Sequence, residues 1–288
     1  MSIKQQIDPH KPKIKLPRGK KYIQIKNIVH QHHLHTICES GRCPNLAECW
    51  GNGTATLMIL GNICTRACKF CSVPTGKPLP PDKNEPQEIA KSIQLMGLSH
   101  CVLTSVDRDD LPDFGAGFWA ETIETIRQLN PKTTLEVLIP DFNYDKSALD
   151  KIIAVHPEIV SHNVETVRRL TPKIRSRAQY DRSLAVLQYL KENGITTKSG
   201  IMLGMGETIK EIDQVMDDLL TVGCKIITIG QYLQPTPKNL PVKKFVTKEE
   251  FERHKKTALA KGFDFVESDS LVRSSYHAEK HVKVNSNN

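Results

Sequence analysis

Six of the eight cysteines in this 288-residue chain fall into two groups of three whose spacing suits metal binding. The first triad is spaced C-x4-C-x5-C and comprises Cys38, Cys43 and Cys49. The second triad is spaced C-x3-C-x2-C and comprises Cys64, Cys68 and Cys71. No secretory signal or membrane-length apolar run is present, so we expect a soluble, cytoplasmic protein whose clustered thiols serve metals or catalysis. Cys101 and Cys224 lie in apolar segments and are expected in the core.

The second triad predicts a 4Fe-4S cluster. Structural zinc usually takes four ligands in paired C-x2-C knuckles, whereas three cysteines in one short loop fit three corners of a cubane and leave the fourth iron open. An open iron can chelate the amino and carboxylate groups of S-adenosylmethionine, and one electron delivered to the sulfonium yields a 5'-deoxyadenosyl radical. Phe70, just before Cys71, is a candidate contact to this cofactor. Structural zinc is the alternative.

The elements that must position the cysteines alternate between apolar runs and amphipathic helical stretches. Strands are predicted over 54–60, 100–106, 134–139, 158–164, 197–203 and 225–231. Helices are predicted over 85–96, 119–129, 146–155, 180–193, 208–222 and 247–261. This alternation implies a parallel sheet buried on both faces. We therefore predict an α/β fold, a partial (β/α)6 TIM-like barrel with N-terminal and C-terminal extensions, whose chemistry lies at the carboxyl ends of the strands.

The net charge of +8 is concentrated at the N-terminus. Residues 1–30 hold eight lysines and arginines against Asp8 alone, with three prolines and no helical period. We predict an extended basic arm that either solvates the terminus or docks on an acidic partner. The rest of the chain is nearly neutral, so neither a nucleic acid nor a membrane is an expected partner.

Four motifs together resemble the lipoyl synthase family of the radical S-adenosylmethionine superfamily. They are CESGRCPNLAECWGN at 38–52, TATLMILGNICTRACKFCSVPTG at 54–76, SVDRDDLP at 105–112 and RSSY at 273–276. The resemblance runs through most of the chain from about residue 36 and implies an enzyme that inserts two sulfur atoms, at carbon 6 and carbon 8, into an octanoyl chain on a carrier lysine. Such unactivated carbons offer nothing to an acid, base or nucleophile, so two 4Fe-4S clusters and S-adenosylmethionine are the implied cofactors.

The resemblance also implies roles for the remaining cysteines and for the RSSY motif. The first triad would bind an auxiliary cluster whose sulfides are consumed, with Ser275 as its weak oxygen ligand and as a catalytic residue. Ser274 is the less favoured neighbour, and a hydroxyl that merely satisfies the tail backbone is the alternative. The implied segments are a basic arm (1–35), an auxiliary-cluster segment (36–53), the barrel (54–234) and a C-terminal extension (235–288).

Polar residues at predicted strand ends resemble the superfamily's contacts to S-adenosylmethionine. They are Asn163 and Glu165 after the fourth strand, and Gly204 and Glu207 in the stretch GIMLGMGE at 200–207. Lys198, on the fifth strand, is expected to meet the cofactor carboxylate. The loop after the second strand departs from the family, because Phe114 and Phe118 occur where glycine and histidine are more usual.

The implied partners are octanoylated lipoyl-carrier domains, either of 2-oxoacid dehydrogenase complexes or of the glycine-cleavage carrier protein. A one-electron reductant such as ferredoxin or flavodoxin is also implied. Two alternatives remain at this point: another radical S-adenosylmethionine sulfur transferase acting on biotin precursors or tRNA, and a non-catalytic protein with two iron-sulfur clusters. A tRNA enzyme would want an extra domain and a basic body, and the sequence has neither.

Overall fold

A computed structural model describes residues 8–13, 19–32, 34–51 and 54–282. Its centre is an eight-stranded sheet whose strands pair in chain order. All neighbouring strands are parallel except the first two, which are antiparallel. Within the described ranges the last strand pairs only with the seventh, so the barrel is open. The prediction of a partial α/β barrel is confirmed.

The strands are β1 (His35–Thr36), β2 (Thr56–Ile59), β3 (His100–Ser105), β4 (Thr134–Leu138), β5 (Ile159–Ser161), β6 (Thr197–Leu203), β7 (Ile226–Gln231) and β8 (Phe265–Asp269). The helices are α1 (Lys20–Gln31), α2 (Ile37–Ser40), α3 (Leu46–Gly51), α4 (Glu85–Met96), α5 (Ala116–Leu129), α6 (Lys146–Ala154), α7 (Thr171–Ile174), α8 (Tyr180–Glu192), α9 (Ile209–Thr221), α10 (Lys248–Lys261) and α11 (Ala278–His281), with a 3-10 turn, η1 (Phe142–Tyr144). All six predicted strands and all six predicted helices are present.

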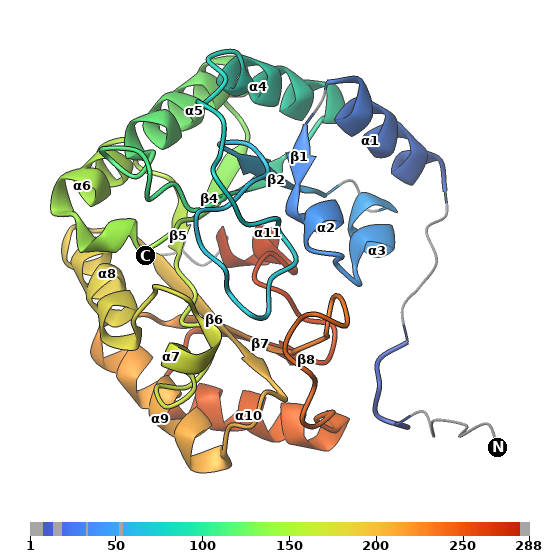
Figure 1. Cartoon of the computed structure of the whole chain (residues 1–288), viewed down its shortest axis with the longest axis vertical. Coiled ribbons are helices and arrows are strands. Elements are labelled where there is room, and N and C mark those ends of the chain that lie inside the picture. Colours follow the sequence, from blue (N-terminus) through green and yellow to red (C-terminus); the bar gives the residue numbers. More distant parts are fainter. Residues whose placement is uncertain (1–7, 14–18, 33, 52–53, 283–288) are drawn as a thin grey trace.

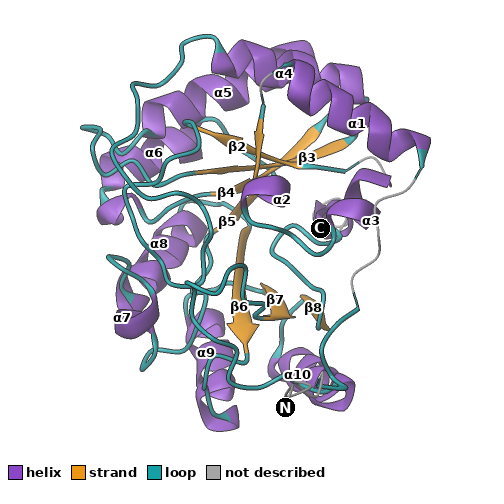
Figure 2. Cartoon of the chain, turned by 45° about the vertical axis from the view of Figure 1, so that its right-hand side comes forward, coloured by secondary structure: helices purple, strands orange, loops and turns teal. Residues whose placement is uncertain are grey.

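The predicted βα units build the barrel wall. Figures 1 and 2 show helices α4, α5, α6, α8, α9 and α10 on the outside of the strands, and Figure 1 shows α11 inside the ring. Strands β2 to β7 are buried almost throughout, as parallel strands covered on both faces must be. Helices α9 and α10 each begin with a capping box, formed by Thr208 with Glu211 and by Thr247 with Glu250. Cys101 and Cys224 are fully buried, as predicted.

The prediction of an extended arm over 1–35 is wrong for residues 20–31, which form helix α1. Ile25 and Val29 of this helix are buried, and the ring of Tyr22 packs 5.6 Å from that of Trp50 in α3. These positions repeat at helical spacing and give α1 one apolar face, which the surrounding lysines obscured in the sequence. Residues 1–7 and 14–18 of the predicted arm lie outside the described residues.

The chain after β8 turns back across the barrel rather than leaving it. At Gly230 of β7, an added Cβ would lie 2.1 Å from the carbonyl oxygen of Val272, so only glycine lets this segment cross so closely. Asn45, between α2 and α3, donates its side-chain N–H to the Leu271 carbonyl at 2.5 Å. Within the described ranges no helix combines the length and apolarity needed to cross a bilayer.

Replacing Ile25 with alanine should lower the free energy of unfolding by roughly 2–5 kcal/mol, because it removes buried methylene groups beneath α1. Urea denaturation followed by circular dichroism measures this change. The matched control is Ile23→Ala on the same helix, whose side chain is 56% exposed. That control should change stability by no more than about 0.5 kcal/mol. Equal losses in the two variants would contradict the buried face of α1.

Candidate active site

One cavity at the carboxyl ends of β2 to β7 is lined by residues of both cysteine triads. Its volume is about 330 Å³. Cys38 and Cys43 of the first triad and all three cysteines of the second triad line it. Apolar side chains from β2, β4 and β6, including Met58, Leu138 and Ile201, cover much of the remainder. Charged and hydrogen-bonding side chains, among them Glu165 and Arg175, line the same cavity. Its size and its combination of apolar and polar walls fit a small-molecule site.

The second triad lies in the loop after β2, where backbone hydrogen bonds order the cysteines. The Cys71 N–H donates to the Cys68 carbonyl at 3.0 Å. The sulfur of Cys64 accepts backbone N–H groups from Arg66 at 3.4 Å and from Asp107 at 3.3 Å. Such donors favour the thiolate form that a metal requires.

Arg66 ties the loop of the second triad to the loops after β3 and β4. Its buried guanidinium lies 3.2 Å from Asp107, 2.7 Å from Asp109 and 2.8 Å from Asp141. The guanidinium holds the pKa of Asp141 well below its usual range despite full burial of that side chain. In the sequence analysis Arg66 appears only as part of the motif at 54–76. Its role in joining these loops was missed because its partners lie in loops distant in sequence.

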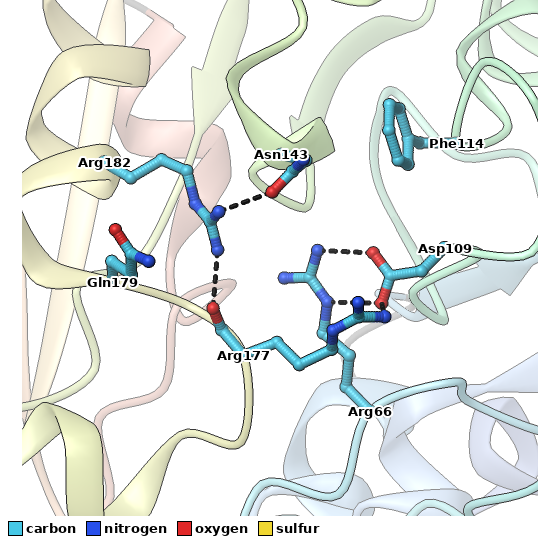
Figure 3. Close-up of a pocket in the computed structure, with 7 residues that line it drawn as sticks. All are labelled: Arg66, Asp109, Phe114, Asn143, Arg177, Gln179 and Arg182. Atoms are coloured by element: carbon cyan, nitrogen blue, oxygen red, sulfur yellow. Dashed lines mark hydrogen bonds and ion pairs between the residues drawn. The ribbon is translucent and has the colours of Figure 1, made fainter.

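A second cavity, of about 300 Å³, borders this network on the rim (Figure 3). Arg182 donates to Asp141 at 2.9 Å, and Arg177 lies 3.3 Å from Asp109. With Arg66, these two guanidinium groups balance three carboxylates. Figure 3 shows the Arg66 and Arg177 guanidinium groups side by side at Asp109.

Neither Phe114 nor Phe118 lines the main cavity, which is the one lined by residues of both triads. Phe114 faces the second cavity, and Phe118 packs against the core. Phe114 also adopts a φ of +56°, in the left-handed region where glycine is favoured. Phe114 and Phe118, the two departures from the family pattern, therefore lie outside the main cavity.

The first triad lies on two short helices and the turn between them. Cys38 is in α2, Cys49 is in α3, and the Cys43 N–H donates to the Cys38 carbonyl at 2.9 Å. The three cysteines line a small cavity of about 30 Å³ together with Arg273 and Ser275 from the C-terminal segment. Residues far apart in the sequence therefore meet at one point.

The two serines of the RSSY motif face different neighbours. Ser275 accepts a hydrogen bond from the Thr56 hydroxyl at 2.9 Å and lines the cavity of the first triad. Ser274 accepts from the Asn163 side chain at 2.5 Å and lines only the larger cavity, toward the second triad. Of the two serines, Ser275 is the one that lines the same small cavity as Cys38, Cys43 and Cys49.

Burial raises the pKa of every thiol in the two triads, to about 12 for Cys38 and Cys64. The thiols are therefore protonated near neutral pH without metal, and metal binding must release these protons. In the described part of the chain, no three His, Cys, Asp or Glu side chains converge on a point that could hold a single metal ion.

Phe70, Asn163 and Glu165, the predicted contacts to S-adenosylmethionine, all line the main cavity. Glu165 accepts from the Asn163 side chain at 3.1 Å, and burial raises the pKa of Glu165. The Oδ1 atom of Asn163 and the Nε atom of Arg175 are buried without a hydrogen-bond partner among the described residues. Arg175 lines the same cavity and was missed by the sequence analysis, since no motif marked it. These orphaned polar atoms fit a site that receives a polar ligand.

The prediction that Lys198 meets the cofactor carboxylate is wrong. Lys198 lies near the amino end of β6 and is fully buried, with both Glu136 carboxylate oxygens within 2.9 Å of its Nζ atom. Gly204 and Glu207 do not line the main cavity either. The Glu207 carboxylate instead accepts the backbone N–H groups of Gly204 and Met205, so it shapes the loop after β6.

Comparisons with known proteins match this geometry. The Radical SAM superfamily model matches residues 58–219. The lipoyl synthase of Bacteroides fragilis is 60% identical to this chain over 95% of both chains. The lipoyl synthase of Christiangramia forsetii is 58% identical over 94% of both chains. The lipoyl synthase of Treponema denticola is 58% identical over 94% of this chain and 93% of its own length. The chain belongs to the lipoyl synthase family. It is thus a radical S-adenosylmethionine sulfurtransferase, and the resemblance first seen in four motifs is confirmed.

Members of the lipoyl synthase family use S-adenosylmethionine and two 4Fe-4S clusters to insert two sulfur atoms into a protein-bound octanoyl chain, and this chain has the cysteines for both clusters. Its substrate is accordingly an octanoylated carrier, and it requires a reductant. Solved structures share the fold at low identity. Methylornithine synthase (PylB) aligns with a TM-score of 0.54 at 14% identity over 91% of this chain and 92% of that chain. SuiB of Streptococcus suis bound to its precursor peptide aligns with a TM-score of 0.59 at 11% identity over 78% and 50%.

Replacing Arg66 with glutamine should loosen the loop of the second triad, because three carboxylates lose their common partner. In the iron-free protein, alkylation of Cys64, Cys68 and Cys71 should accelerate by about tenfold or more. Iodoacetamide labelling read at each cysteine by mass spectrometry measures this. Arg127→Gln removes a half-exposed ion pair to Glu158 and is the matched control. If Arg66→Gln labels no faster than this control, the network does not order the loop.

Proposed function

We propose that the two triads divide the work of lipoyl formation between them. Cys64, Cys68 and Cys71 would hold the cluster that binds S-adenosylmethionine, and Cys38, Cys43 and Cys49 would hold the auxiliary cluster. The observation that carries this assignment is the single cavity lined by both triads. An octanoyl chain in that cavity would be within reach of both groups.

When bound, S-adenosylmethionine supplies a radical that removes hydrogen from unactivated carbon, and the auxiliary cluster supplies the sulfur. The chain's own residues hold and orient these groups. The orphaned Oδ1 of Asn163 and Nε of Arg175 would receive polar groups of S-adenosylmethionine beside Phe70 and Glu165. Met58, Leu138 and neighbouring apolar residues would exclude water around the octanoyl chain.

Ser275 would be the fourth ligand of the auxiliary cluster. Its hydroxyl shares a cavity with the first triad, and the buried guanidinium of Arg273 lines the same cavity, where positive charge favours an oxygen anion. An oxygen ligand binds iron less firmly than a thiolate, so the auxiliary cluster can give up its sulfides. Gly204 and Glu207 would contribute by shaping the loop after β6 rather than by direct contact.

The finer partners are those implied by the family. The octanoyl group would arrive on carrier domains of 2-oxoacid dehydrogenase complexes or of the glycine-cleavage carrier protein. Ferredoxin or flavodoxin would donate the electron. Reduced thiols in two metal sites support a cytoplasmic location. Functionally, the chain divides into the auxiliary-cluster segment (36–53), the barrel (54–234) and the C-terminal extension (235–288), which also contributes β8.

Alanine substitutions within each triad should separate the two roles. The reconstituted wild type should hold about eight iron atoms, and a variant lacking either triad should hold about four. Loss of Cys64, Cys68 or Cys71 should abolish reductive cleavage of S-adenosylmethionine. Loss of Cys38, Cys43 or Cys49 should preserve part of that cleavage but stop sulfur insertion into an octanoyl-lysine peptide, measured by mass. Equal loss of cleavage from both triads would overturn the division of roles.

Ser275→Ala should keep an auxiliary cluster on three cysteines but lower lipoyl formation by about tenfold or more, the scale expected when a group that tunes a metal site is lost. Ser275→Cys should slow iron release to a chelator and make sulfur donation poorer, because thiolate binds iron more firmly. Ser274→Ala is the matched control for iron release, since Ser274 faces Asn163. Full lipoyl formation by Ser275→Ala would refute the ligand assignment.

A further inference from the structure

A buried ion pair inside the barrel has no part in the chemistry described above. Lys198 of β6 and Glu136 of β4 are both fully buried, and the Lys198 Nζ atom lies 2.8 Å and 2.9 Å from the two carboxylate oxygens. Ser161 of β5 donates its hydroxyl to the same carboxylate at 2.8 Å. The pair therefore links three strands in the interior of the barrel.

The third donor of the ammonium group goes to the C-terminal segment. The Lys198 Nζ atom lies 3.2 Å from Nδ1 of His281, the last residue of α11. An ammonium group can only donate, so in this contact Nδ1 accepts and the imidazole is neutral, with its proton on Nε2. Nε2 is buried and has no hydrogen-bond partner among the described residues, so the contact with Lys198 is the hydrogen bond by which this ring is held. Burial lowers the pKa of His281, which agrees with a neutral ring. The ring is fully buried and packs edge-on against Phe265 at 4.2 Å.

Without this histidine the ion pair would be left incomplete. A buried ammonium group with an unsatisfied donor is costly, whereas hydrogen bonds to charged groups are among the strongest in proteins. Helix α11 has only four residues and cannot be stable without tertiary contacts. Its position inside the barrel (Figure 1) must therefore depend on what it contacts there.

The same segment carries Ser275, six residues before His281. Between the two, Tyr276 donates its hydroxyl to Glu48 at 3.3 Å, and Ser275 itself accepts from Thr56. These are contacts of partly buried groups, whereas the contact of His281 is fully buried and involves a charge. His281 is thus the residue after Ser275 that joins the C-terminal segment to a fully buried charge.

We propose that His281 is a positioning residue: by completing the hydrogen bonding of the buried Lys198–Glu136 pair, it fastens the C-terminal segment inside the barrel and holds Ser275 at the first triad. The consequence for sulfur transfer rests on the proposed role of Ser275 as a ligand, whereas the fastening of the segment does not. Lys198, which the sequence suggested as a cofactor contact, instead holds His281 near the amino end of β6.

Amide hydrogen exchange of the full-length protein tests directly whether His281 fastens the C-terminal segment. The iron-free protein is used, so that no cluster influences the exchange rates. His281→Leu keeps an apolar body but removes the acceptor. Peptides covering residues 270–281 should then exchange about tenfold faster or more, as loss of a hydrogen bond to a buried charge predicts. Ser161→Ala removes a hydrogen bond to the same carboxylate without touching the segment, and its 270–281 peptides should exchange at the wild-type rate.

A second pair of variants keeps the test decisive if His281→Leu does not fold. His281→Asn places an amide oxygen near the position of Nδ1, whereas His281→Gln places it near Nε2 and away from Lys198. The asparagine variant should protect residues 270–281 better than the glutamine variant. Equal exchange in these two variants, or wild-type exchange in His281→Leu, would overturn the proposal.

Iron release from the reconstituted protein separates this proposal from the role of Ser275. If both hold, His281→Leu and Ser275→Ala should each speed release of the auxiliary iron to a chelator, but only His281→Leu should loosen the segment. If Ser275 is not a ligand, Ser275→Ala will leave iron release unchanged while His281→Leu still raises exchange. If the fastening fails, exchange will stay at the wild-type rate whatever Ser275→Ala does.

Discussion

The architecture of the site depends on one buried guanidinium group. Arg66 lies within the C-x3-C-x2-C segment and contacts carboxylates from the loops after two other strands. Burying charge is costly unless each group is paired, and here Arg177 and Arg182 complete the balance at the same carboxylates. The loop that carries three thiols is consequently fastened to the barrel by ion pairs between the chain's own residues. A flexible loop would instead lose conformational entropy when its cysteines bind a cluster.

The first triad is built by a different device. Its cysteines lie on short helices that are held against β2 by β1, and the wall of its cavity is completed by a segment from the far end of the chain. Gly230 lets that segment cross β7, while Asn45 holds the Leu271 carbonyl. The two triads thus differ in kind: the loop of the second triad is held by ion pairs to the loops after β3 and β4, whereas the wall of the first triad's cavity is completed by the C-terminal segment.

The repeating part of the fold could be predicted from the sequence, since periodicity and motif spacing are local properties. Both triads and the six βα units follow from patterns of that kind, whereas Ser275 was singled out only by the resemblance of the RSSY motif to the family. Helix α1 was missed because its lysines mask an apolar face that becomes clear only beside Trp50. Lys198 was misassigned because a strand can be predicted without knowing which end of it faces the site. His281 contacts Lys198, which is distant in sequence, and Arg175 lies in no recognised motif, so no pattern within the sequence marks either residue.

The crossing of the C-terminal segment over Gly230 has a consequence for biosynthesis. Translation proceeds from the N-terminus, so Cys38, Cys43 and Cys49 emerge from the ribosome well before Ser275 does. During that interval the βα units can assemble while the wall of the first triad is still open on the side that the C-terminal segment later covers. The order of synthesis therefore provides an open form of the first site before its final, closed form, with no moving part beyond the end of the chain itself.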